Sequence, residues 1–271
     1  MLKLRRFLLI AVLMGIVGLV VGGGCGGGGH GSRVYGTGTG TNSSTGTGSG
    51  STNPSNGSGG TLGDSTQTLG GVSGCLVHTP STYAHGGACV KLLMTSHGNG
   101  GSPSDMMPYW TPVADAKHFI VCSVPHGIID STGAITTAGG QFVSARDDMF
   151  TKYNIDKNAV YANGFSGGGQ VAFWAVLETA GWAGNMCFSS TIGSTANPLP
   201  KASGELPIYW KNCEDDPFFA WSMVQPNYDA VVAGGHNVHG HDIWPAGSSH
   251  SMGIQNCTEA WDWTTNPANK P

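Results

Sequence analysis

The sequence contains few charged residues. Only 12 Lys and Arg and 16 Asp and Glu residues are spread over 271 positions, and the formal net charge is −4. No basic stripe is present, which argues against a nucleic-acid partner. No Cys-x-x-Cys pair occurs, so a cysteine-built zinc site is not expected. No internal repeat is visible, which excludes solenoid and propeller architectures.

The apolar run near the N-terminus is shorter than a membrane-spanning helix. Lys3, Arg5 and Arg6 precede the apolar run FLLIAVLMGIVGLVV, which is shorter than the ~20 residues that cross a bilayer. Small residues and Cys25 follow, an order typical of an export signal. The cysteine resembles the lipidated residue of a bacterial lipoprotein, although Gly22 stands where leucine is usual. We expect residues 1–25 to direct export and Cys25 to anchor the protein to the membrane of the cell envelope by a lipid. Plain secretion and an uncleaved anchor are the alternatives.

The next segment, residues 26–71, has almost no apolar or charged side chains. Gly, Ser, Thr and Asn dominate it, and Arg33 and Asp64 are its only fixed charges. Such a composition cannot bury enough apolar surface to offset the entropy lost on ordering the backbone. We therefore predict a flexible tether.

Residues 72–271 are long enough for one sizeable core, and we predict that they form a single catalytic domain. The cysteines after Cys25 are even in number, and an exported chain can oxidise them. Cys75 and Cys89 flank a short turn-rich segment and are the first candidates for a bridge.

Apolar β-type runs alternate with helix-type stretches throughout this region. The predicted strands are CVKLLMTS, FIVCSVP, AVYANG, MCFSSTIG, LPIYWKN and HNVHGHDIW. The predicted helices are MMPYWTPVADAKH, QFVSARDDMFTKYN, GGQVAFWAVLETAG, FFAWSMVQPNYDAVVAGG and IQNCTEAWDWTT, with a polar loop over 126–140. This alternation predicts an α/β fold with a mainly parallel sheet that helices cover on both faces.

A Gly-x-Ser-x-Gly motif lies where one predicted strand meets the following helix. In Gly164-Phe165-Ser166-Gly167-Gly168, the residues two before and two after the serine are small, as a tight strand-to-helix turn requires. Ser166 is then a nucleophile exposed near a helix N-terminus, which favours negative charge. The alternative is that the glycines serve close packing and the serine is incidental.

A serine nucleophile needs a base, and usually an acid that orients the base. Asp216 follows a predicted strand and is our choice of acid, with Asp215 as the second choice. His250, in the small-residue loop PAGSSHSMG, is the predicted base. The alternatives are an ordinary acidic turn and an ordinary loop histidine.

A rival cluster is His236, His239 and His241, whose spacing faintly resembles that of metal ligands. No second cluster supplies further ligands, so we predict no metal site.

Acyl transfer also needs N–H donors for the oxyanion of its transition state. We expect the backbone N–H of Gly167 to be one donor. The glycine-rich SHGNGGS follows an earlier strand and places Asn99 as the second, with Gly100 as the alternative.

Together SHGNGG, FIVCSVPHG, YNIDKNAVYANGFSGGG, EDDPFF and GSSHSMG resemble the polyhydroxybutyrate depolymerase and feruloyl-esterase-like branch of the α/β-hydrolases. The resemblance implies a serine esterase that acts on polyester, aryl-ester or acyl-sugar bonds without a cofactor. This chain departs from the group in having Gly167-Gly168-Gly169 at the elbow where many members carry alanine, and KNC before the acid where HGT is common. Cys213 and Cys257 would flank the acid and the histidine, so a bridge between them is a second candidate.

No long apolar insertion could form a large lid, so we expect an open site. Phe165 and Trp244 are the aromatic residues that we expect to line it. The predicted protein is an exported, monomeric serine esterase whose ester substrate can be polymeric. The alternative function is a surface-displayed binding protein on a hydrolase fold that has lost activity.

Overall fold

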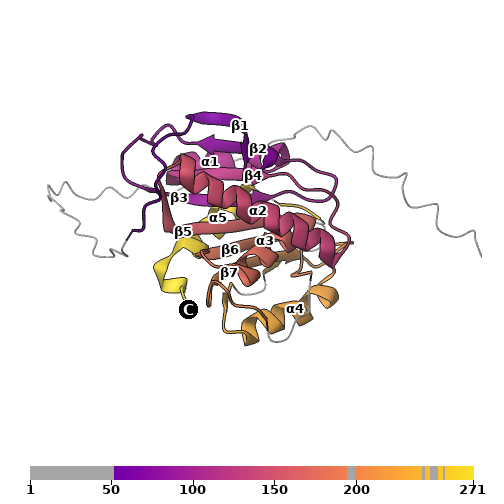
Figure 1. Cartoon of the computed structure of the whole chain (residues 1–271). Coiled ribbons are helices and arrows are strands. Elements are labelled where there is room, and N and C mark those ends of the chain that lie inside the picture. Colours follow the sequence, from indigo (N-terminus) through magenta and orange to yellow (C-terminus); the bar gives the residue numbers. More distant parts are fainter. Residues whose placement is uncertain (1–51, 194–198, 240–241, 245–249, 253) are drawn as a thin grey trace, which may run out of the picture. The chain divides into compact units, whose positions relative to one another are not determined.

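A mixed sheet forms the centre of the computed structural model, which describes residues 52–193, 199–239, 242–244, 250–252 and 254–271 (Figure 1). The predicted signal, Cys25 and most of the predicted tether lie outside these ranges. No helix among the described residues is long and apolar enough to cross a membrane. The strands in the described ranges are β1 (Gly63–Leu69), β2 (Val72–Thr79), β3 (Val90–Ser96), β4 (Phe119–Val124), β5 (Ile155–Phe165), β6 (Gly184–Phe188), β7 (Pro207–Cys213), β8 (Asn237–Val238) and β9 (Asp242–Trp244).

The strand order is β1-β2-β4-β3-β5-β6-β7-β8, and β9 also pairs with β7. The β1–β2 and β2–β4 pairs are antiparallel, and every other pair is parallel. All residues of β4, β6 and β7 are buried, as expected for strands covered on both faces. The carboxyl ends of the parallel strands therefore share one edge, where ligand and catalytic sites of such sheets form.

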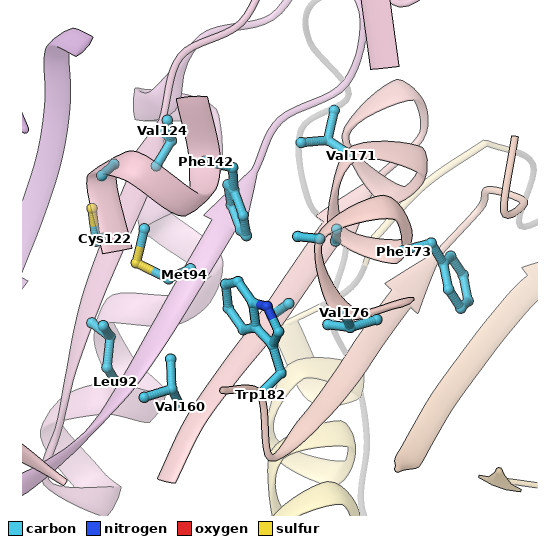
Figure 2. Packing of buried hydrophobic residues seen from close by; sticks show 14 of the residues in the cluster. Leu92, Met94, Cys122, Val124, Phe142, Val160, Val171, Phe173, Val176 and Trp182 are labelled. Carbon is cyan, nitrogen blue, oxygen red and sulfur yellow. The ribbon is translucent and has the colours of Figure 1, made fainter. Parts of the chain in front are cut away.

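Helices cover both faces of the sheet. Residues of α2, α3 and α4 pack into one buried cluster, and residues of α1 and α5 pack into the other. Figure 2 shows part of the first cluster, in which Phe142 of α2 stacks on Trp182 and α3 contributes Val171, Phe173 and Val176. The predicted α/β class with a mainly parallel sheet is thus confirmed. The helices are α1 (Met107–Lys117), α2 (Thr132–Lys152), α3 (Gly167–Glu178), α4 (Trp221–Ala233) and α5 (Ile254–Thr265), with the 3₁₀ turns η1 (Pro103–Asp105) and η2 (Pro267–Asn269).

The predicted boundary of the tether at residue 71 is wrong. Residues 63–69 form β1, whose side chains alternate between the two faces and end on the fully buried Leu69. Ser and Thr are compatible with a half-exposed edge strand, because such a strand buries only alternate residues. Hydrogen bonding to β2 offsets the backbone entropy that this segment loses on ordering. The composition of the segment alone predicts no such compensation.

The preceding residues are also bound to the domain. The Ser55 N–H donates to the Ile155 carbonyl at 2.7 Å, and the Gly57 N–H donates to the Phe150 carbonyl at 3.0 Å. The Tyr83 hydroxyl donates to the Gly59 carbonyl at 3.0 Å. We call residues 53–59 the N-terminal arm.

Helix α2 begins earlier than predicted. The segment 132–140, which was expected to be loop, is helical. Ser131 caps it by accepting a hydrogen bond from the Ala134 N–H, and Ile135, Ala138 and Gly139 bury one face. The polar composition of this segment predicts a loop, but its apolar residues are buried in the folded protein. The predicted strand HNVHGHDIW is instead two short strands, β8 and β9.

Neither predicted disulfide is present among the described cysteines. The register of β2 on β4 pairs Val77 with Cys122, so Cys122 neighbours Cys75 across the strands. A hydrogen bond with the Cys122 thiol lowers the pKa of Cys75. Cys213 donates from its Sγ to Asp215 Oδ1 at 2.7 Å. Sequence separation alone could not reveal these neighbours, because they depend on strand pairing.

Candidate active site

Ser166 lies on a sharp turn between β5 and α3. Its φ of 55° and ψ of −126° place a non-glycine residue in a sparsely populated region of backbone conformation. Such strain is common at functional residues and needs support from the surrounding structure. Here the Ser166 N–H donates to the Phe188 carbonyl at 3.1 Å, and its own carbonyl accepts from the Gly169 N–H at 3.0 Å. Strand and helix therefore hold the serine in the geometry of a nucleophile elbow.

The glycines of the motif are required by close approach. A Cβ on Gly164 would lie 2.1 Å from the Gly168 carbonyl oxygen. A Cβ on Gly168 would lie 2.3 Å from the carbonyl oxygens of Ser96 and His97, at the end of β3. The small residues before and after Ser166 thus bring β3, β5 and α3 together at one point.

Asp216 and His250 are joined by a direct hydrogen bond. His250 Nδ1 lies 2.8 Å from Asp216 Oδ2, and the carboxylate is fully buried whereas the imidazole is 16 % exposed. The other carboxylate oxygen, Oδ1, accepts from the backbone N–H groups of Phe218 at 2.8 Å and Phe219 at 2.9 Å. These three contacts fix the carboxylate, and the carboxylate in turn orients the ring of His250 so that Nδ1 donates.

Three phenylalanines surround His250. The ring of Phe165, the residue before the serine, has its centroid 4.8 Å from that of His250. Phe218 packs edge-on at 4.9 Å, and Phe219 stacks at 5.9 Å. The contact with Phe165 places His250 beside the elbow. Phe218 is 50 % exposed, so an apolar surface continues from the histidine to solvent.

The loop after β3 lies against the start of α3. A Cβ on Gly167 would meet Asn99 Oδ1 at 2.4 Å, so the Asn99 amide fills the space beside Gly167. That amide is held by Ile129, whose N–H donates to Oδ1 at 2.8 Å and whose carbonyl accepts from Nδ2 at 2.9 Å. The backbone N–H of Asn99 has no acceptor among the described residues. The N–H of Gly167, the first residue of α3, likewise lacks an intrahelical partner.

Ser190 and Asn212 join the parts of the site, and the sequence analysis did not anticipate either. Ser190 Oγ donates to the carbonyl oxygen of Ser166. Asn212 Oδ1 accepts from the Ser190 N–H at 3.3 Å, and its Nδ2 donates to the Phe219 carbonyl at 3.3 Å. Polar residues within otherwise apolar strand ends were the available signal. The pair connects the elbow to the loop that carries Asp216.

Asn163, directly below the elbow, is a third residue that the sequence analysis missed. Its Oδ1 accepts from Thr95 Oγ1 at 2.7 Å and from Trp110 Nε1 at 2.8 Å. Its Nδ2 donates to the Met186 carbonyl at 2.9 Å. This fully buried amide ties α1, β3 and β6 to the strand that ends at Ser166.

Two predicted features fall partly outside the described structure. The backbone of Trp244 lies in β9 opposite Cys213, but the position of its side chain is not described. His241 of the rival histidine cluster is not described either. Among the residues that are described, no group of His, Cys, Asp and Glu could hold a metal ion.

Several solved structures with a similar fold are esterases. Thermogutta terrifontis esterase 2 matches with a TM-score of 0.58 and 13 % identity, over 74 % of this chain and 92 % of that one. The Bacillus cereus carboxylesterase matches with a TM-score of 0.58 and 14 % identity, over 70 % and 92 %. The chain has an α/β-hydrolase fold. An esterase from Pyrobaculum calidifontis also matches with a TM-score of 0.58, over 76 % and 86 %.

At the sequence level, no protein-family model matches the chain. A curated protein, the bifunctional acetylxylan esterase/xylanase XynS20E of Neocallimastix patriciarum, is 30 % identical over 138 residues, which is 49 % of this chain. The match spans 20 % of the length of that relative.

Proposed function

We propose that this α/β-hydrolase is a serine esterase with Ser166 as nucleophile, His250 as general base and Asp216 as the acid that orients it. The observation that carries the proposal is the Asp216–His250 hydrogen bond of 2.8 Å beside a serine on a strained elbow. A packing role alone would not require a positive φ at Ser166, nor a buried carboxylate on a histidine packed against its neighbour Phe165. The esterases that share the fold support the same reaction class.

In the proposed reaction, Ser166 Oγ attacks the ester carbonyl carbon while His250 Nε2 takes the hydroxyl proton. Asp216 stabilises the resulting imidazolium through Nδ1. The N–H groups of Gly167 and Asn99 stabilise the oxyanion. The C–O bond to the alcohol then breaks, and the alcohol leaves with the proton from Nε2. Water, activated by His250, attacks the acyl-enzyme and releases the acid and the free serine.

The proposed substrates are carboxylic esters that can reach an open, apolar surface. Phe218 and Phe165 border His250, which suits an acyl or alcohol group of aromatic or aliphatic character. The resemblance to depolymerases and feruloyl esterases favours polyhydroxyalkanoate or feruloyl esters. The acetylxylan esterase/xylanase that matches half of this chain adds acetyl groups on xylan as a candidate substrate.

We also propose that residues 1–25 direct export and that a lipid is attached at Cys25. Metabolic labelling with a radioactive fatty acid tests it, by comparing the wild type with Cys25→Ala. Label on the wild type alone supports the anchor, and label on neither protein leaves plain secretion or an uncleaved segment.

The esterase proposal is tested by the hydrolysis of p-nitrophenyl butyrate at mildly alkaline pH. We expect Ser166→Ala to remove turnover while the circular dichroism spectrum and the thermal midpoint stay close to those of the wild type. A fluorophosphonate probe should label the wild type at Ser166. Equal rates in both proteins, or a folded wild type that neither turns over nor takes the probe, would favour the inactive binding protein.

A further inference from the structure

The loop that follows β4 is bonded to the loop that follows β3. The backbone N–H of His126 donates to His97 Nε2 at 3.3 Å, and His126 Nε2 lies 2.7 Å from the His97 carbonyl oxygen. The two imidazoles stack with centroids 4.0 Å apart and planes 8° apart. The bonds between Asn99 and Ile129 extend the same contact. His97 and Asn99 therefore both take their position from residues 126–129.

The hydrogen bonds determine where the proton of the His97 ring lies. His97 Nδ1 donates to the Gly98 carbonyl at 2.8 Å, and its Nε2 accepts, so this ring is neutral. Burial lowers the pKa of His97, which favours the same neutral form. Each ring nitrogen of His126 faces a carbonyl oxygen, Nε2 that of His97 at 2.7 Å and Nδ1 that of Gly127 at 2.6 Å, and a carbonyl oxygen can only accept. His126 is thus the donor, and the backbone of the β3 loop is the acceptor.

The His97 carbonyl oxygen, which accepts from His126, lies close to both proposed oxyanion donors. It is one of the two oxygens that a Cβ on Gly168 would meet at 2.3 Å, so it touches the first turn of α3. One residue further along comes Gly98, and then Asn99, whose N–H is the proposed second oxyanion donor. A rotation of the His97 peptide would change the distance between that N–H and the N–H of Gly167. Donors help an oxyanion only when they are preorganised at hydrogen-bond distance.

We propose that His126 is a positioning residue for the oxyanion loop. Its Nε2–H, bonded to the His97 carbonyl, holds that peptide so that the Asn99 N–H points at the oxyanion. This inference rests on the proposed esterase function. His126 acts through His97 on the transition state and not on bound substrate. Its loss should therefore lower kcat and leave KM almost unchanged.

The test separates the donated hydrogen bond from the ring stack. His126→Phe keeps an aromatic ring against His97 but removes the donor. His126→Gln loses the ring but can place an amide N–H near the former Nε2 position. His126→Asn carries the same amide on a shorter side chain that does not reach the His97 carbonyl. All three keep the backbone N–H that donates to His97 Nε2.

We expect His126→Phe and His126→Asn to lower kcat roughly 10- to 100-fold, whereas His126→Gln stays within about threefold of the wild type. KM should change less than about twofold in all of them. A trifluoromethyl ketone, which forms a tetrahedral oxyanion on the serine, should lose affinity by the factor by which kcat/KM falls. His85→Phe is the matched control, because His85 also meets a backbone carbonyl through Nδ1 but lies at the N-terminal arm.

Equal losses in the Gln and Asn variants would overturn the inference, as would a loss that appears in KM with unchanged inhibitor affinity. If His126→Phe fails to fold, the Gln and Asn pair still decides. Ser166→Ala separates the two levels. Turnover that survives Ser166→Ala overturns the proposed esterase, whereas turnover that vanishes there but is unchanged in His126→Asn overturns only the role of His126.

Discussion

At the scale of single residues, the two neighbouring aspartates have different partners. Asp216 binds His250 and two backbone N–H groups, whereas Asp215 accepts a hydrogen bond from Cys213. Sequence reasoning preferred Asp216 but kept Asp215 as a second choice, because adjacent acids in a turn cannot be ranked without their contacts. The geometry makes the distinction testable.

Asp216→Asn should lower kcat of ester hydrolysis by about 10³- to 10⁴-fold, because an amide NH₂ facing Nδ1 favours the wrong imidazole tautomer. Asp215→Asn should stay within about threefold of the wild type, since the proposed reaction does not use it. Steady-state kinetics on p-nitrophenyl butyrate measures both. A larger loss in the Asp215 variant would exchange the two roles.

The side chain of Ser190 leaves no space for a larger residue at position 169. A Cβ on Gly169 would lie 2.4 Å from the Cβ of Ser190. Gly169→Ala should destabilise the protein by about 1–3 kcal/mol through overpacking. Ser190→Gly removes the opposing atom. In urea denaturation the double variant should therefore be destabilised less than the two single changes added together, and strict additivity would contradict the contact.

At the scale of elements, α2 contains two adjacent glycines with opposite surroundings. A Cβ on Gly139 would lie 2.0 Å from Trp174 of α3, whereas a Cβ on Gly140 meets no atom within 4 Å. The first glycine permits the close contact of α2 with α3, and the second only weakens the helix.

Gly140→Ala should therefore raise the free energy of unfolding by about 0.5–1 kcal/mol, because alanine loses less backbone entropy in a helix. Gly139→Ala should lower it by about 1–3 kcal/mol, because Trp174 has to move. Chemical denaturation of both variants measures the difference. A destabilising Gly140→Ala would mean that the helix is frayed there in solution.

The arm and β1 form a second element-scale feature, since composition predicts them to be part of a flexible tether. A chain starting at residue 72 lacks β1, and the full burial of Leu69 alone stabilises by about 1.5–3 kcal/mol. We expect residues 52–271 to melt roughly 5–10 °C above residues 72–271. Differential scanning calorimetry of the two proteins measures this. Equal midpoints would show that β1 adds no stability.

At the scale of the whole molecule, the arm and the site lie at opposite ends of β5. The arm bonds to Ile155, the first residue of that strand, and Ser166 follows its last residue.

Two buried histidines predict the dependence of stability on pH. Burial lowers the pKa values of His97 and His236 below the ordinary 6.5. The unfolded chain binds protons at these sites more readily than the folded one, so their contribution is complete above about pH 6.5 and decreases as the pH falls towards the folded pKa values.

Thermal midpoints measured between neutral and mildly acidic pH should therefore fall with decreasing pH. His236→Asn, whose Oδ1 can replace Nδ1 as acceptor for the Leu206 N–H, should show a shallower fall than the wild type. His85→Asn, at an exposed position, is the control and should keep the slope of the wild type. Identical slopes in all three proteins would contradict the contribution of His236.

Much of the architecture could be predicted from the chain alone. Apolar runs of strand length alternating with helical periodicity indicate βαβ units, because each pattern has one compatible way to bury its apolar side. The prediction was wrong where local composition and tertiary context disagree. The 132–140 segment is helical because Ile135 and Ala138 find a core, and β1 is ordered because β2 offers hydrogen bonds.

By itself, the sequence determined the α/β class and identified Ser166, Asp216 and His250 as candidates. Residue types and the spacing of small residues are local properties of the chain and can be recognised without the fold. Only the tertiary structure decided that Asp216 bonds to His250, that Cys75 lies beside Cys122, and that His126 holds the loop of Asn99. Those relations join residues far apart in the chain. They depend on strand order and register, which the packing of the whole sheet selects and no local pattern encodes.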